Sequence, residues 1–159
     1  MQKKEEIPVL VAEIKDELAK LNMLAGKLSS QMSRLTNEEI AESAALRLHN
    51  FYTGCERIFR LIASEVNGGV PQDLDWHKRL LTRVGLEIEN IRPAVISSQT
   101  RKDLEELLKF RHIVRNLYGF ELEPKRIKPL IVLTTSLYPH LADEIEKFAA
   151  FLMEVYNGA

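Results

Sequence analysis

Apolar side chains recur along the N-terminal part of the chain at alternating steps of four and three residues, which is the spacing of one face of an α-helix. They are Ile7, Val11, Ile14, Leu18, Leu21, Ala25, Leu28, Met32 and Leu35. Pro8 is compatible with this helix because proline is tolerated in the first turn, where its missing N–H would have no intrahelical partner. The pattern therefore predicts a long amphipathic helix that begins near Pro8.

A second helix is predicted directly after the first. Thr36 or Asn37 can accept a hydrogen bond from the first turn, and Glu38 and Glu39 suit the positive end of the helix dipole. We expect this helix to end near residues 67–69, Asn-Gly-Gly, and to pack against the first helix as a long antiparallel pair. Its apolar positions are Ile40, Ala44, Leu48, Phe51, Cys55, Ile58 and Ile62.

The third predicted helix is shorter. It begins beside Asp73 and Asp75 and ends before Pro93, because proline disfavours helical geometry in the residue before it. Its apolar positions are Trp76, Leu80, Leu81, Val84 and Ile88. For Trp76 and His77 the pattern favours a structural interpretation, a capped first turn with the indole packed on the bundle, over a role in base stacking.

Two more helices complete the predicted fold. One of the polar residues between Ser97 and Thr100 caps the fourth helix, and Gly119 is suited to end it. The fifth helix begins at Glu123-Pro124, and Pro139 inside it predicts a kink because proline removes a backbone donor. No strand-like alternation is present. The fold class is therefore predicted to be all-α, an up-and-down bundle of about five helices with a long antiparallel first pair.

Composition agrees with a single helical domain over residues 1–159. The chain has 159 residues, of which 45% are hydrophobic and 28% charged, a balance typical of globular domains. No apolar run approaches the roughly 20 residues that cross a bilayer. The first residues, MQKKEE, are not followed by an apolar signal core. We therefore expect a cytoplasmic protein without a membrane partner.

Charge and cysteine content narrow the chemistry. A formal net charge of −1 argues against a surface covered with cations, so any nucleic-acid site must be a local basic patch. Cys55 is the single cysteine, which permits no internal disulfide, and its place in an apolar stripe predicts a small core residue. The four histidines lack zinc-ligand spacing, so no metal or other cofactor is expected.

The stretch 109–118, KFRHIVRNLY, carries the strongest candidate chemistry. At about 100° per residue, Arg111, Arg115 and Tyr118 fall within roughly a 60° arc of one helix. Guanidinium groups bind phosphate oxygens, and a tyrosine ring can stack on a base. Lys109 adds positive charge beside them, so this face suits a phosphodiester.

His112 and Asn116 are four residues apart on a neighbouring face of the same helix. An imidazole can transfer protons near neutral pH, and an amide can hold a phosphate. A structural interpretation is also open, because cations in the last turns of a helix stabilise its dipole and often have no other role. Spacing alone leaves both interpretations standing.

The order of Arg111, four residues, Asn116, one residue, Tyr118 resembles the motif of the HepT-like toxin family of HEPN domains, in which a histidine stands at the second of these positions. Trp76-His77 before Leu80-Leu81, and Arg92-Pro93, are further features similar to the family. The resemblance extends over most of the chain.

This resemblance implies a HEPN-like bundle that forms a homodimer. The first apolar stripe is wide enough to serve both a core and a partner helix, although a core alone explains it equally well. Pattern and resemblance together lead us to expect a dimer through that surface. The family relationship implies that Arg111 and residue 116 face a groove between the two copies, where RNA is cut without a metal, with tRNA as a candidate substrate. Arg111, Asn116 and His112 are the candidate catalytic residues, and Arg115 and Lys109 the candidate RNA-binding residues.

The family also implies a partner, an MNT-type nucleotidyltransferase antitoxin that attaches AMP to the motif tyrosine. Tyr118 is the corresponding residue here. A phosphodiester-linked nucleotide beside Arg111 and Arg115 would neutralise their guanidinium groups and block the groove, so modification would silence the toxin.

Asn116 departs from the family pattern, because asparagine cannot exchange a proton near neutral pH. A second alignment, which begins the motif at Arg115, has Phe-Glu-Leu at 120–122 where a histidine is expected. Three interpretations stay open. His112 has taken over proton transfer, although four helical residues separate its position from 116 by about 6 Å; the protein binds RNA without cutting it; or cutting relies on arginine alone. The alternative function is a catalytically inactive HEPN adaptor that binds RNA or a partner protein.

Overall fold

The computed structural model describes residues 5–66, 69–116 and 122–158, without the side chains of Arg115 and Asn116. Its elements are α1 (Glu6–Gln31), the 3₁₀ turn η1 (Met32–Arg34), α2 (Glu38–Glu65), α3 (Trp76–Val84), α4 (Ser98–Asn116) and α5 (Pro124–Gly158). Over these ranges the backbone forms no strand beyond one isolated bridge, between Ile88 and Arg92. The predicted all-α class is confirmed. No helix among the described residues is both long and apolar enough to cross a membrane.

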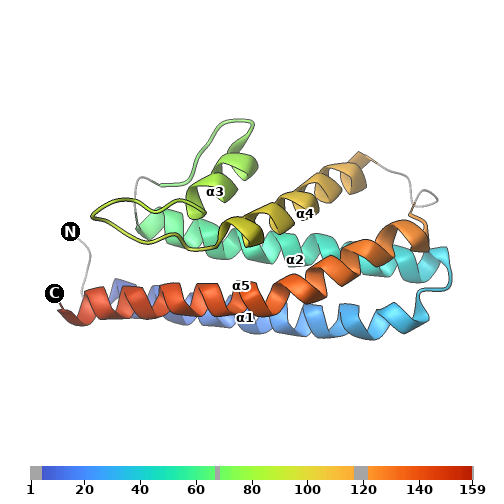
Figure 1. Cartoon of the computed structure of the whole chain (residues 1–159), viewed down its shortest axis with the longest axis horizontal. Coiled ribbons are helices and arrows are strands. Elements are labelled where there is room, and N and C mark those ends of the chain that lie inside the picture. Colours follow the sequence, from blue (N-terminus) through green and yellow to red (C-terminus); the bar gives the residue numbers. More distant parts are fainter. Residues whose placement is uncertain (1–4, 67–68, 117–121, 159) are drawn as a thin grey trace.

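Three long helices form the body of the molecule (Figure 1). α2 and α5 both run antiparallel to α1, so the predicted long antiparallel first pair is confirmed. The apolar stripes face one another in this body, and burying each large side chain contributes roughly 1.5–3 kcal/mol. Fully buried members include Ile14, Leu21, Leu28, Leu48, Phe51, Phe59 and Ile58.

The stripe of α1 is used almost entirely inside the chain. Its central members, from Val11 to Leu28, are buried against α2 and α5. Val9 and Met23 are the large apolar side chains of α1 that are exposed in the described structure. A dimer contact by α1 would therefore use residues beside the stripe rather than the stripe itself.

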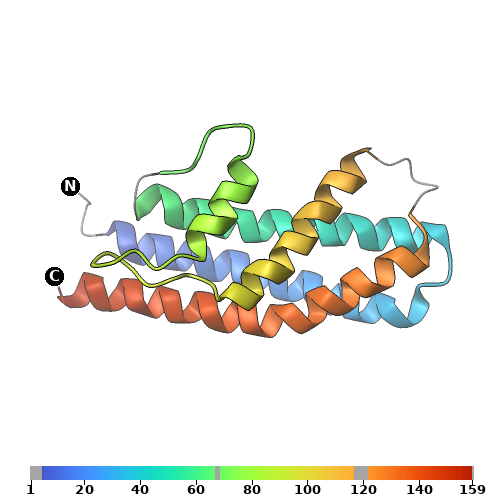
Figure 2. The same ribbon diagram turned by 45° about the horizontal axis from the view of Figure 1, so that its top comes forward.

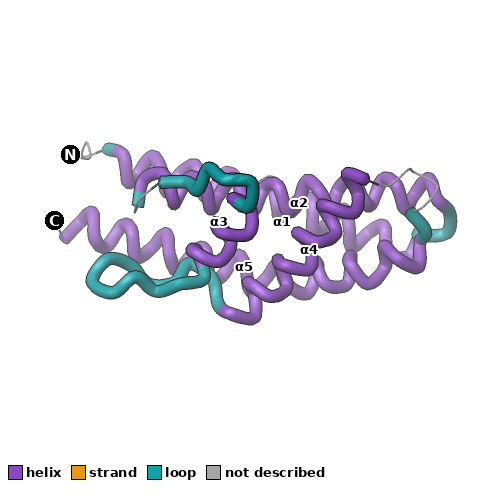
Figure 3. The backbone as a smooth tube through the Cα atoms, turned by 90° about the horizontal axis from the view of Figure 1, so that it is seen from above, coloured by secondary structure: helices purple, strands orange, loops and turns teal. Residues whose placement is uncertain are grey.

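α3 and α4 form a second layer that lies obliquely over α2 (Figures 2 and 3). α4 begins against α5, where the Glu144 carboxylate accepts hydrogen bonds from Ser97 N (2.7 Å) and Thr100 Oγ1 (3.0 Å). The Ser97 hydroxyl accepts from Thr100 N at 3.2 Å, which confirms a cap in the predicted place. From there α4 crosses toward α2 and carries its second half to the α2 and α3 surface.

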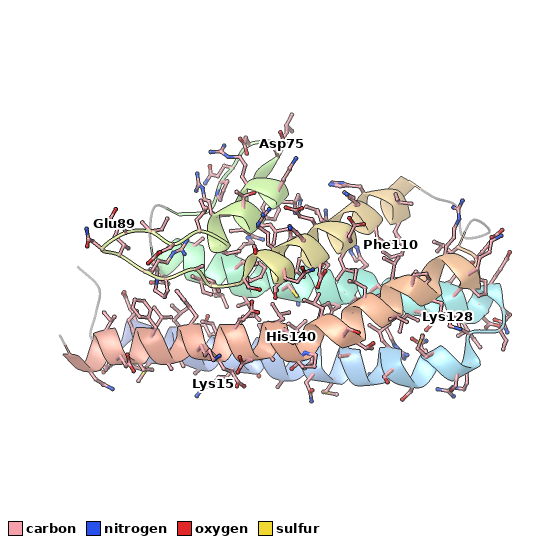
Figure 4. All side chains as sticks on the ribbon, viewed as in Figure 1. Lys15, Asp75, Glu89, Phe110, Lys128 and His140 are labelled. Carbon is pink, nitrogen blue, oxygen red and sulfur yellow. The ribbon has the colours of Figure 1, made fainter. Side chains whose placement is uncertain are left out.

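The predicted helix signals act locally as expected. Pro8 lies in the first turn of α1, and Asn37 Oδ1 accepts a hydrogen bond from Ile40 N at 3.0 Å. α5 contains Pro129 as well as Pro139. The helix changes direction along its length near His140, which is labelled in Figure 4. Proline accounts for such a bend because it removes a hydrogen bond of the helix.

The third helix ends earlier than its apolar spacing predicts, at Val84 rather than beyond Ile88. The Arg92 guanidinium supports this end of the helix together with Val95 N, which donates to the Val84 carbonyl oxygen at 2.8 Å. The guanidinium donates hydrogen bonds to the carbonyl oxygens of Arg83 (2.9 Å), Leu86 (2.8 Å) and Pro93 (3.1 Å). A buried cation thus satisfies the carbonyl end of α3, and burial lowers the pKa of Arg92 from its ordinary value. Arg92 therefore has a structural role here.

Candidate functional site

The side of α2 that faces α3 and α4 carries a row of polar side chains. Tyr52, Glu56 and Arg60 follow one another at steps of four residues, which places them on one face of the helix. Glu56 is only 5% exposed, although a carboxylate is rarely buried without a partner. The partner of this carboxylate comes from α3.

His77, in the first turn of α3, makes that contact. Its Nδ1 lies 2.5 Å from Glu56 Oε2, and its side chain is 15% exposed. Arg111 Nη1, on α4, lies 3.4 Å from His77 Nε2. A guanidinium only donates, so Nε2 is the acceptor and Nδ1–H donates to Glu56. The result is a chain of carboxylate, imidazole and guanidinium, with one member from each of three helices.

Trp76 packs on the imidazole of His77, and Arg60 packs on Trp76. The Trp76 ring stacks on the imidazole, with the centroids 3.6 Å apart and the planes at 30°. The Arg60 guanidinium carbon lies 5.2 Å from the centroid of the Trp76 ring, a cation–π contact. Trp76 also packs against the hydrophobic core, which confirms the packing predicted for it.

The first turn of α3 is held differently from the predicted cap. Asp75, labelled at the outer end of α3 in Figure 4, makes no side-chain capping hydrogen bond. The Asp73 carbonyl oxygen accepts from Trp76 N at 3.2 Å, and the Asp73 carboxylate pairs with Arg79. The turn therefore depends on backbone bonding and on Trp76, and it leaves His77 directed at Glu56.

Arg111 is half-buried, on the side of α4 next to the buried Phe110. Its Nε is buried and has no hydrogen-bond partner in the described structure. A buried donor without a partner costs roughly 1–3 kcal/mol, which the Arg111 side chain would recover by turning Nε toward an acceptor. A guanidinium has five N–H donors, and His77 takes one of them at a long distance. Arg111 is therefore suited to receive an anion.

His112 and Lys109 lie on either side of Arg111 along α4. His112 is exposed, and its ring is perpendicular to that of His77 with the centroids 6.5 Å apart. The structure thus brings His112, Arg111 and His77 together. Lys109 Nζ lies 3.1 Å from Glu106 on the exposed face, a pair of the kind that contributes little to stability.

The remaining predicted site residues fall outside the described part of the chain. α4 ends at Asn116, so the backbone of Arg115 and Asn116 forms its last turn, but their side chains are not described. Tyr118 lies wholly outside the described residues. The roles of these three residues stay predictions.

Two buried groups beside the cluster are held neutral. Burial, and then the nearby Glu56 carboxylate, raise the pKa of the Tyr52 phenol well above its ordinary value. The same two causes raise the pKa of the Cys55 thiol. Cys55 is a buried core residue, as predicted. Neither group is a nucleophile near neutral pH, because both need the anionic form. Over the described ranges, no group of three or more His, Cys, Asp and Glu side chains could hold a metal ion.

Sequence reasoning did not find Glu56, and it gave His77 a structural role. Their partnership spans 21 residues and two helices, so no helical spacing connects them. One signal was present. Glu56 lies between Cys55 and the buried residues that follow it, so the helix pattern buries a charge there. A buried glutamate predicts a cationic or hydrogen-bonding partner from another element.

The fold and this cluster define an all-α domain in which Glu56, His77 and Arg111 meet at the junction of α2, α3 and α4. Residues 43–152 match the model of a family described as HepT-like protein. The chain belongs to this HepT-like family of HEPN domains. The matched range contains Glu56, His77 and Arg111 as well as the altered motif. Neither the curated proteins nor the solved structures contain a match to the chain.

Proposed function

We propose that this protein is the toxin component of a toxin–antitoxin pair, an endoribonuclease that works without a metal and uses Arg111 to hold the scissile phosphate. The observation that carries the proposal is the state of the Arg111 side chain. It is half-buried, its Nε has no partner among the described residues, and it contacts His77 with one Nη at 3.4 Å. A phosphate could take two of its donors at once.

The surroundings of Arg111 favour RNA as the ligand. A partly buried guanidinium interacts with phosphate more strongly than an exposed one, because the local dielectric constant is lower. Exposed His112 lies close by, and Arg60 and Trp76 extend the site toward α2. An indole and guanidinium groups are typical of surfaces that bind single-stranded RNA. Family membership supports RNA rather than another phosphate ester.

Two partners belong to the same proposal. In a homodimer, the Arg111 sites of the two copies would line one groove, in which Asn116 would hold a phosphate or a 2′-hydroxyl. An MNT-type nucleotidyltransferase would attach AMP to Tyr118. A bound AMP would compete with RNA for Arg111 and Arg115, so the modified toxin would be silent.

Cleavage of total RNA and purified tRNA in the presence of a chelator tests the nuclease. The parent is compared with Arg111→Ala and Asn116→His, and Arg34→Ala is the matched control because Arg34 is exposed on η1. We expect the parent and the control to cut RNA. Arg111→Ala should lose roughly a hundredfold or more, the effect of removing one charge-stabilising group at a reacting centre.

The same variants distinguish the nuclease from the alternative function, a catalytically inactive adaptor. Asn116 in the place of the family histidine is the observation that favours a catalytically inactive adaptor. An inactive parent with an active Asn116→His would mean a preserved groove that lacks its proton carrier. If the parent and both variants are inactive, the nuclease is excluded and the adaptor is favoured.

The modification is tested separately. The protein is incubated with ATP and an MNT-type nucleotidyltransferase, and the peptide that contains Tyr118 is analysed by mass spectrometry beside that of Tyr118→Phe. We expect one or more AMP adducts on the parent peptide, none on the variant, and loss of cleavage in proportion to modification. Adducts on a different residue would contradict the proposed role of Tyr118.

A further inference from the structure

The site contains a histidine that is oriented as a proton carrier, although it is not the histidine of the family motif. Glu56 Oε2 lies 2.5 Å from Nδ1 of His77, and the carboxylate is 5% exposed. Trp76 stacks on one face of the same ring at 3.6 Å. A buried carboxylate on one ring nitrogen fixes the tautomer and leaves the other nitrogen with its lone pair.

That other nitrogen, Nε2, is directed at Arg111. The Arg111 Nη1 to His77 Nε2 distance is 3.4 Å, longer than a usual N–H···N or N–H···O hydrogen bond. A phosphate is the stronger acceptor for a guanidinium. When Arg111 turns its donors to a phosphate, the lone pair of Nε2 is released beside the reacting group.

We propose that His77 is the general base of this site, held by Glu56, and that it supplies from α3 the proton transfer for which Asn116 on α4 is unsuited. The inference rests on the proposed ribonuclease function. It also avoids a geometric difficulty that His112 has. The position of a histidine on α3 does not depend on the residue spacing along α4. His112 can reach the position of residue 116 only by a shift of about 6 Å along its own helix.

The proposed step balances without a metal or an oxidant. The 2′-hydroxyl oxygen bonds to the adjacent phosphorus while its proton passes to His77 Nε2. The bond from phosphorus to the 5′-oxygen breaks, and that oxygen takes a proton from water. The imidazolium then gives its proton to the hydroxide that remains. The products are a 2′,3′-cyclic phosphate and a 5′-hydroxyl, and Glu56 stabilises the transient imidazolium.

Two substitutions distinguish a proton carrier from a structural histidine. His77→Asn keeps an N–H near the position of Nδ1 for Glu56 and deletes Nε2. His77→Gln places an amide near Nε2, where its oxygen can accept from Arg111. If His77 only holds its neighbours, each amide restores one of its two contacts. If it carries a proton, neither amide replaces it.

The experiment measures metal-free cleavage of an RNA oligonucleotide that the parent cuts, together with binding of the uncleavable version with a 2′-deoxy residue at the cut. We expect both variants to cut about a hundredfold more slowly or worse, with binding within about threefold of the parent. His140→Gln, on the exposed side of α5, is the matched control and should cut like the parent. Circular dichroism shows which variants are folded.

Added imidazole provides a readout that a structural role would not give. His77→Ala opens a site beside Glu56, and we expect free imidazole to raise its cleavage rate about tenfold or more. Cleavage by His77→Gln within threefold of the parent, or an Ala variant that imidazole does not restore, would overturn the role of His77 and leave the nuclease intact. A parent that does not cleave would overturn the nuclease, and this inference with it.

Discussion

The two sides of α2 differ in chemistry. Toward α1 and α5 the helix is mainly apolar, with Phe51 in edge contact with Tyr138 of α5 at 6.2 Å between centroids. Its polar contacts with α1 are those of Arg57 with Glu17 and of Ser43 with Gln31. Toward α3 and α4 it presents Tyr52, Glu56 and Arg60, and Glu56 is buried although it is charged. One helix thus contributes to the core on one side and to the candidate site on the other.

The apolar side of α2 contributes mainly to stability, and the polar side contributes mainly to the candidate site. The apolar side gains free energy from every buried methylene group, and no geometry beyond close packing is required. The polar side buries a carboxylate, which stabilises a fold less than apolar residues of the same volume. A buried carboxylate held by a histidine is a candidate for function because stability does not require it. Substitutions on the apolar side should therefore change the free energy of unfolding, and substitutions on the polar side should change the rate of RNA cleavage.

Among the substitutions considered, Phe51→Ala should cause the largest change, a fall in the free energy of unfolding. Phe51 is fully buried, and truncating such a phenylalanine destabilises a protein by about 3–5 kcal/mol, since the core loses contacts and gains a cavity. Equilibrium urea denaturation measures this loss. RNA cleavage per folded molecule should stay close to that of the parent.

Exposed Leu46, on the same helix, is the matched control for Phe51, and Leu46→Ala should change stability by less than about 0.5 kcal/mol. A Phe51→Ala protein that is fully stable would show that α2 is not anchored through this side. Loss of cleavage in the folded fraction of the variant would show that the two sides are coupled.

Glu56→Gln should give the opposite result, a loss of activity with little change in stability. Glutamine can still accept the hydrogen bond from His77 Nδ1, but it lacks the charge that stabilises the imidazolium. We expect kcat to fall about tenfold or more, which is about 1.4 kcal/mol, with KM unchanged because RNA binding does not involve Glu56. Steady-state cleavage and thermal melting measure the two effects.

The control for Glu56 is Glu42→Gln, which removes an exposed carboxylate from the same helix and should leave both constants unchanged. A Glu56→Gln protein with a raised KM and parental kcat would place Glu56 in RNA binding instead. Equal kcat in variant and parent would remove the carboxylate from the mechanism, because the proposed role is confined to the transition state.

The contrast between the two sides of α2 also explains how far the sequence could predict the molecule. The core follows from spacing within single helices, so the stripes of α1 and α2 and the cap at Asn37 were all predictable. The early end of α3 was not, because it depends on the Arg92 side chain reaching back to the Arg83 carbonyl nine residues earlier.

The candidate site shows the same limit more strongly. Arg111 and His112 were identified from their place on one helix and from the family motif. His77 contacts Glu56 at a separation of 21 residues and Arg111 at a separation of 34. Such contacts depend on how helices cross, and helical periodicity carries no information about crossing. No partner for His77 is evident in the sequence, so its place in a first turn beside Trp76 favoured a structural role.

Two glycines give the smallest and most local comparison. A Cβ at Gly54 on α2 would lie 2.6 Å from Leu21 Cδ2 on α1, so this glycine permits the close approach of the first helix pair. Leu21 is 1% exposed, and overpacking a tight core costs about 1–3 kcal/mol. Removing a glycine from a helix interior returns about 0.5–1 kcal/mol. Gly54→Ala should therefore be destabilising by about 1 kcal/mol net.

Gly26→Ala is the matched substitution, because Gly26 is at an exposed position of α1 and a Cβ there would have no atom within 4 Å. It should stabilise the protein by about 0.5–1 kcal/mol through helix propensity alone. If α1 and α2 pack as described, urea denaturation should show that the free energy of unfolding falls in Gly54→Ala and rises in Gly26→Ala. Stabilisation by both would mean that Leu21 moves aside freely and that the first helix pair is less tightly packed than its burial indicates. RNA cleavage should respond to neither variant, because the α1 side of α2 is separate from His77 and Arg111.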